Sequence, residues 1–83
     1  MPTKEKLINK LLNSPKGFTV HDFTGLMGKC GAIELKAGRG SGIKYSAKGV
    51  ILAFDLPHPQ KELYPYQIEM VKAFLKRIGE IDG

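Results

Sequence analysis

The chain is poor in cysteine, has no tryptophan and contains no long hydrophobic run. Its one cysteine, Cys30, cannot form an internal disulfide and has no second cysteine with which to hold zinc, so we interpret it as a small core residue. A membrane-spanning helix needs about 20 consecutive apolar residues, and no segment approaches that length. The N-terminus has a lysine-rich helical pattern in place of a signal peptide. We therefore expect a cytoplasmic protein that does not insert into a membrane.

The size and composition are those of one small globular domain. With 83 residues the chain can build a single compact core, so we assign residues 1–83 to one domain and exclude a two-domain enzyme. Hydrophobic residues make up 42% of the chain and charged residues 25%, which is the balance of an ordinary folded protein and not of a disordered tail.

The net charge of +5 is spread unevenly along the chain. Residues 1–31 and 32–48 each carry a net charge of +3, whereas residues 49–83 carry −1. Four basic residues follow one another without an intervening acid: Lys36, Arg39, Lys44 and Lys48. Such a cluster attracts a phosphate backbone if it forms one surface, and the alternative is a solvated lysine face without a partner.

Helical spacing of apolar residues predicts three helices. The best-marked start is at Val20, because Thr19 can cap the helix while Asp22 answers the backbone amide of the cap, and Phe18 and Phe23 can pack as a hydrophobic staple. We expect the helices at residues 4–13 behind the cap Thr3, from Val20 to Gly31, and from Pro65 to about Gly79.

Three strands are predicted between the second and third helices. Residues 32–37 alternate as a half-buried strand whose apolar side is Ile33, Leu35 and Ala37, and a glycine-rich turn at 38–42 leads into a second strand at 43–48. The apolar run 50–54 implies a strand that is covered on both faces or an edge that awaits a partner. The predicted fold class is α+β, with the order α-α-β-β-β-α, a three-stranded antiparallel sheet and the helices packed on one face. The other sheet face would be free and carry lysines.

Histidine is the natural general base for metal-independent RNA cleavage, and the chain has only two. His58 lies between two prolines in a stiff loop after the third strand, where it can serve as a base or simply bond to neighbouring backbone. His21 lies in the first turn of a helix, where the helix dipole disfavours the protonated form, so we expect a surface role. Tyr45, Tyr64 and Tyr66 can stack on bases or belong partly to the core.

Four segments occur in a characteristic order along the chain: an opening helix that reads Lys-Glu-Lys-Leu-Ile-Asn-Lys-Leu-Leu, the turn Gly40-Ser41, the segment His58-Pro59-Gln60-Lys61-Glu62-Leu63 and a final helix that ends Leu75-Lys76-Arg77-Ile78-Gly79. Through these segments almost the whole chain resembles the HicA-type mRNA interferase toxins of bacterial toxin-antitoxin pairs. The resemblance implies a fold like the double-stranded-RNA-binding domain, an endoribonuclease activity on mRNA without a metal or other cofactor, and a HicB-like antitoxin as partner.

The sequence departs from the better-known members of that family at one position. Those proteins carry their catalytic histidine after the glycine-serine turn, and this chain has Gly42 there. His58 is then the remaining candidate base for catalysis. The expected RNA-binding residues are Lys36, Arg39, Ser41, Lys44 and Lys48.

Two other functions stay open at this point. Gly42 in place of a histidine fits an RNA-binding module without catalysis. A protein-interaction domain, in which residues 50–54 pair with a partner strand and the basic charge is incidental, fits the apolar third strand. The sequence leaves open the RNA target and the oligomeric state, a homodimer included.

Overall fold

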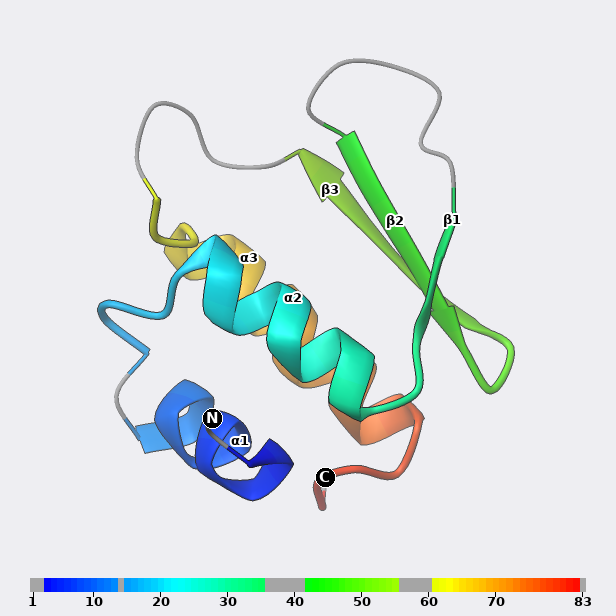
Figure 1. The fold of residues 1–83 in the computed structure, drawn as a ribbon, viewed down its shortest axis with the longest axis horizontal. Helices are drawn as coiled ribbons and strands as arrows, with labels where there is room; N and C mark the ends of the chain where they lie inside the picture. Colours follow the sequence, from blue (N-terminus) through cyan, green and yellow to red (C-terminus); the bar gives the residue numbers. More distant parts are fainter. Residues whose placement is uncertain (1–2, 14, 36–41, 56–60, 83) are drawn as a thin grey trace.

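The computed structural model describes residues 3–13, 15–35, 42–55 and 61–82, and three helices and three strands lie within these ranges (Figure 1). The elements in chain order are α1 (Lys4–Asn13), α2 (Val20–Lys29), β1 (Ile33–Leu35), β2 (Gly42–Ala47), β3 (Val50–Asp55) and α3 (Pro65–Arg77). This order confirms the predicted α+β architecture. None of the helices in the described ranges combines the length and the apolar character needed to cross a bilayer.

The three strands form one antiparallel sheet in which β2 is central. Lys44 of β2 pairs with Leu35 of β1 on one side and with Ala53 of β3 on the other. Strands β2 and β3 are joined by the two-residue turn Lys48-Gly49, in which both residues have positive φ, +50° and +81°. This is the conformation of a type I′ turn, whose twist matches that of the two strands it connects.

The core lies between one face of the sheet and the helices. Ile43, Tyr45 and Leu52 are buried on that face. The ring of Phe23 from α2 lies 5.5 Å from the ring of Tyr45, edge to face, and 5.3 Å from that of Phe54. Helix α3 packs along β3, and α1 packs against α2 and α3 on the side away from the sheet (Figure 1). The sheet therefore has one covered and one open face.

The start of α2 follows the predicted capping pattern. The Thr19 hydroxyl accepts a hydrogen bond from the Asp22 amide, and the Asp22 carboxylate accepts one from the Thr19 amide. The same carboxylate oxygen accepts a hydrogen bond from the Lys10 ammonium of α1 at 2.7 Å. Burial alone would raise the pKa of the Asp22 carboxyl, but the bonds from Lys10 and Thr19 together outweigh it and lower the pKa. One carboxylate thus caps α2 and ties it to α1.

Strand β1 differs from the prediction, because its apolar residues face outward. Ile33 pairs with Ser46 and Leu35 with Lys44, both on the open face, while Glu34 pairs with the buried Tyr45. All three β1 residues are exposed, and Ile33 retains 66% of its accessible surface. The expected half-buried strand is therefore wrong. Pairing with β2 sets which residues face the helices, and β1 lies at the edge of the sheet, where the helices leave it uncovered.

The open face of the sheet is more apolar than expected. Its exposed side chains include Ile33, Leu35, Ile51 and Ala53, which surround the half-buried Ser46 and Lys44. Among the described strand residues on this face, Lys44 is the basic one. The expectation of a lysine-rich face is thus met at one position in the described part of the chain.

Candidate functional site

One end of the sheet collects the attachment points of two segments that carry predicted site residues. Gly42, the first residue of β2, pairs with Asp55, the last residue of β3. In the sequence, residues 36–41 directly precede Gly42, and residues 56–60 directly follow Asp55. A shallow hollow of about 250 Å³, lined by residues 42–44 and 53–55, lies at the same end. Both segments therefore leave the sheet from neighbouring positions.

Most of the predicted site residues belong to those two segments. Lys36, Arg39, Ser41 and His58 lie outside the described residues. Lys44 is described and lines the hollow at the Gly42 end of the sheet.

Lys48 has a different place from Lys44. It lies in the turn at the opposite end of β2, and its ammonium donates a hydrogen bond of 3.0 Å to the carbonyl oxygen of Ile78, just past α3. A cation at the C-terminal end of a helix is stabilised by the carbonyl groups there. The structure thus separates the two described lysines of the predicted basic cluster, with one on the sheet and the other on the end of α3.

The buried side chain of Gln67 ties the end of β3 to the start of α3. Its amide nitrogen donates a hydrogen bond of 2.6 Å to the carbonyl oxygen of Asp55, and its amide oxygen accepts one of 2.9 Å from the Tyr64 amide. Gln67 is completely buried, and both polar ends of its side chain are used. Because Asp55 and Tyr64 flank residues 56–63, Gln67 fixes the distance that the segment with His58 must span. Sequence reasoning missed this residue.

The chain after residue 60 is held by the start of α2. The Val20 amide donates to the Lys61 carbonyl at 2.8 Å, and the Leu63 amide donates to the Phe18 carbonyl at 2.9 Å. The Glu62 carboxylate accepts a hydrogen bond from the Gly17 amide at 3.0 Å. The segment 56–60 therefore connects two points that are both anchored to the core.

The remaining predicted candidates are three tyrosines and His21, and Tyr64 among them lies at the start of α3, which Gln67 ties to the end of β3. Tyr45 is buried, and burial together with the charge of Glu34 raises the pKa of its phenol. Tyr64 and Tyr66 stack nearly parallel, with ring centroids 6.1 Å apart, and Tyr66 is 58% exposed. His21 is exposed in the first turn of α2, as expected. Tyr45 is thus a core residue, while Tyr66 keeps an accessible ring.

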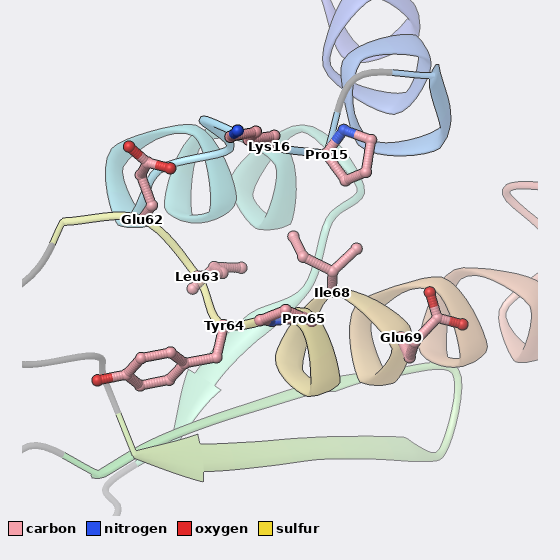
Figure 2. A pocket seen from close by; sticks show the side chains of 8 residues that line it. All are labelled: Pro15, Lys16, Glu62, Leu63, Tyr64, Pro65, Ile68 and Glu69. Carbon is pink, nitrogen blue, oxygen red and sulfur yellow. The ribbon is translucent and has the colours of Figure 1, made fainter.

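A second hollow, of about 530 Å³, opens between the α1–α2 connection and the start of α3 (Figure 2). The side chains of Leu63 and Ile68 lie between Pro15 above and Pro65 below, and the carboxylate of Glu62 lies at the rim (Figure 2). Its lining is mostly apolar and also contains Lys16 and Glu69. Two carboxylates beside an apolar floor do not suit a polyanion, so we place no nucleic acid there.

Replacing Gln67 with leucine is expected to lower the free energy of unfolding by about 2 kcal/mol, because it leaves the Asp55 carbonyl and the Tyr64 amide without their partner. Urea unfolding followed by circular dichroism measures the change. The control is Lys76→Leu, which introduces the same side chain at an exposed position of α3 and should change stability by less than about 0.5 kcal/mol. Equal effects of the two substitutions would show that the Gln67 bonds contribute nothing.

Comparisons of the chain with protein-family models, with curated proteins and with solved structures found no match.

Proposed function

We propose that this protein is a cytoplasmic RNA-binding toxin of the HicA type, which engages mRNA at the Gly42 end of its sheet and is neutralised by a HicB-like antitoxin. One observation carries the proposal: the pairing of Gly42 with Asp55 brings together the attachment points of the segments that contain Arg39, Ser41 and His58. Cleavage needs the base and the phosphate-binding groups close together, and these residues are distant in sequence. The neighbouring positions of Gly42 and Asp55 on the sheet are compatible with such an arrangement.

The charge of residues 32–48 supports a polyanionic ligand, although the exposed Asp55 lines the same hollow as Lys44. Residues 32–48 carry a net charge of +3, and the one acid of that range, Glu34, is exposed on the sheet face opposite to that of Lys44. Lys44 lies on the open face, where a phosphate can reach its ammonium. Phosphate contacts by lysine and arginine supply most of the sequence-independent affinity for RNA.

The chemistry of cleavage is assigned to His58. In the neutral form its imidazole takes the proton of a ribose 2′-hydroxyl, and the 2′-oxygen attacks the adjacent phosphorus. The bond to the 5′-oxygen of the next nucleotide breaks, which leaves a 2′,3′-cyclic phosphate, and the 5′-oxygen takes up a proton from water. A cation is needed beside the phosphate, because negative charge builds up on its oxygens during attack. Arg39 and Lys44 are the candidates for that role, and Ser41 can donate a hydrogen bond to the same group.

Lys44→Gln is expected to weaken RNA binding at every sequence tested and to lower the slope of log affinity against log salt concentration by about one, the loss of one phosphate contact. Fluorescence anisotropy with labelled single-stranded RNA over a range of salt concentrations measures both quantities. His58→Ala in the background of each protein keeps the RNA intact during the titration.

The control for this experiment is Lys6→Gln. Lys6 is an exposed lysine of α1, which packs against helices and not against the sheet, so its loss changes the net charge equally at a distant place. The salt slope should stay at the parental value in this variant. If both variants behave alike, RNA contacts the chain through diffuse charge and the proposed surface is wrong.

A further inference from the structure

Strand β3 is an edge of the sheet, and its outward backbone groups can be identified from the register. Ala47 and Val50 flank the type I′ turn and form the hydrogen-bonded pair that closes the hairpin. Hydrogen-bonded and non-hydrogen-bonded pairs alternate along an antiparallel ladder. The backbone amide and carbonyl groups that point away from β2 therefore belong to Ile51, Ala53 and Asp55.

The fold gives a partner to one end of this edge, and the groups in its middle have none among the described residues. The outward carbonyl of Asp55 is the group that accepts the hydrogen bond from Gln67. Within the described ranges, the backbone hydrogen bonds outside helices and strands involve neither Ile51 nor Ala53. Four backbone groups, two donors and two acceptors, are thus presented in the spacing that an added strand requires.

A groove runs beside this edge, between β3 and α3. It has a volume of about 200 Å³ and is lined by residues 50–52 of β3 and by Met70, Ala73, Phe74 and Arg77 of α3. Met70, Ala73 and Arg77 follow at spacings of three and four residues, so they lie on one face of the helix. Ile51 is 59% exposed at the border of the groove with the open sheet face. The walls are apolar, and Arg77 is the charged residue among the described residues of the lining.

The charge of the chain decides between two kinds of occupant. A second copy would bring one net charge of +5 against another, and the groove offers no carboxylate within its described lining to receive a second Arg77. An acidic segment has the complementary charge, and its side chains would alternate between the groove and the open face.

We propose that the free edge of β3 binds an extended, acidic segment of a partner protein as a fourth strand. Its backbone pairs with the groups of Ile51 and Ala53, its apolar side chains contact Met70 and Ala73, and a carboxylate faces Arg77. The groove beside Met70 and Arg77 lies at the turn end of β3, whereas Ala53 pairs with Lys44 and also lines the hollow at the Gly42 end. Strand addition uses backbone groups of β3 and the groove, so the proposal does not depend on RNA binding.

The backbone part is tested with a short synthetic peptide that alternates valine and threonine and carries a glutamate at each end. NMR titration of the full chain, followed at the amide signals of Ile51 and Ala53, measures binding up to millimolar peptide. Ile51→Pro removes an amide that does not bond to β2, whereas Ile51→Ala removes the same exposed side chain and keeps the amide. We expect Ile51→Pro to bind about tenfold more weakly than Ile51→Ala. Equal affinity of the two variants would overturn strand addition.

The charge part is tested with Arg77→Glu. This variant should lose affinity for the glutamate peptide about tenfold and gain affinity for a peptide with lysines at the same places. Lys6→Glu makes the same change in net charge on α1 and should leave both affinities as they are. Thermal unfolding of each variant shows that the fold is retained.

Three results would overturn the proposal. The first is that the unmodified chain binds neither peptide. The second is that sedimentation finds a dimer that Ile51→Pro dissociates, which would make a second copy the occupant. The third is that RNA displaces the peptide from the protein with Lys44→Gln as readily as from the parent chain, which would place nucleic acid on this edge.

Discussion

Replacing Phe23 with alanine is expected to lower the free energy of unfolding by about 3 to 5 kcal/mol. The Phe23 side chain is completely buried, and its ring contacts Tyr45 from β2 and Phe54 from β3. Its removal loses the hydrophobic transfer energy and both ring contacts, and it leaves a cavity where α2 meets the sheet. The total free energy of unfolding of a small domain is about 5 to 15 kcal/mol. The variant should therefore unfold at a much lower urea concentration than the parent chain.

The control for Phe23 is Thr24→Ala on the next residue of the same helix. Thr24 is exposed, and its hydroxyl donates to the His21 carbonyl at the surface, so the loss should stay within about 0.5 kcal/mol. Urea unfolding of both variants, followed by far-ultraviolet circular dichroism, gives the comparison. A loss below about 1 kcal/mol for Phe23→Ala would mean that the core between α2 and the sheet is not packed as described.

The helices could be predicted closely because their signals are local. The spacing of apolar residues in 4–13 and the capping pair Thr19 and Asp22 depend on neighbours within one or two turns of the chain. The structure starts α2 at Val20 and α3 at Pro65, as predicted. The ends of α2 and α3 differ, since α2 stops at Lys29 and α3 at Arg77, each two residues before the glycine that was expected to end it. Signals that depend only on nearby residues can thus be interpreted without knowledge of the tertiary structure.

The orientation of β1 could not be predicted because it is decided by distant residues. An alternating strand indicates two different faces but not which of them meets the helices. That choice depends on the register with β2, which places Glu34 beside Tyr45 and turns Ile33 and Leu35 outward. The apolar residues of β1 therefore belong to an exposed surface, whereas the alternating pattern alone predicts that they face the core.

The different places of Lys44 and Lys48 and the role of Gln67 could not be predicted from the sequence. Lys44 and Lys48 look equivalent in the sequence, and only the turn at Lys48-Gly49 and the approach of α3 direct the second lysine to the Ile78 carbonyl. Gln67 gave no signal either, because a glutamine at that position fits the polar side of a helix equally well. Its burial follows from the docking of α3 against the end of β3. The roles of such residues depend on partners that are distant in sequence, so they can be recognised only in the folded structure.

The free edge of β3 connects the sequence pattern with the packing. The run 50–54 left two alternatives, a strand covered on both faces or an edge awaiting a partner, and the structure places β3 at the edge with one face covered. Because β3 is an edge strand, Ile51 stays exposed and lies beside the groove that contains Arg77. The proposed RNA surface lies at the Gly42 end of the sheet, and the groove of the proposed protein surface lies at the turn end of β3, with Ala53 between them.

His58→Ala is expected to slow RNA cleavage about 100-fold or more, because a positioned general base contributes that much to proton transfer. The chain supplies its own matched control, since His21 is its other histidine and lies exposed on α2. His21→Ala should cleave labelled RNA at the parental rate, and both variants should keep the parental affinity for RNA and the parental thermal unfolding. The assay is run in EDTA, so that cleavage by a contaminating metal-dependent nuclease is suppressed. If His58→Ala still cleaves RNA, the assignment of the base is wrong. If the parent chain binds RNA in a salt-sensitive way but does not cleave it, the protein is a non-catalytic RNA-binding module and not a nuclease.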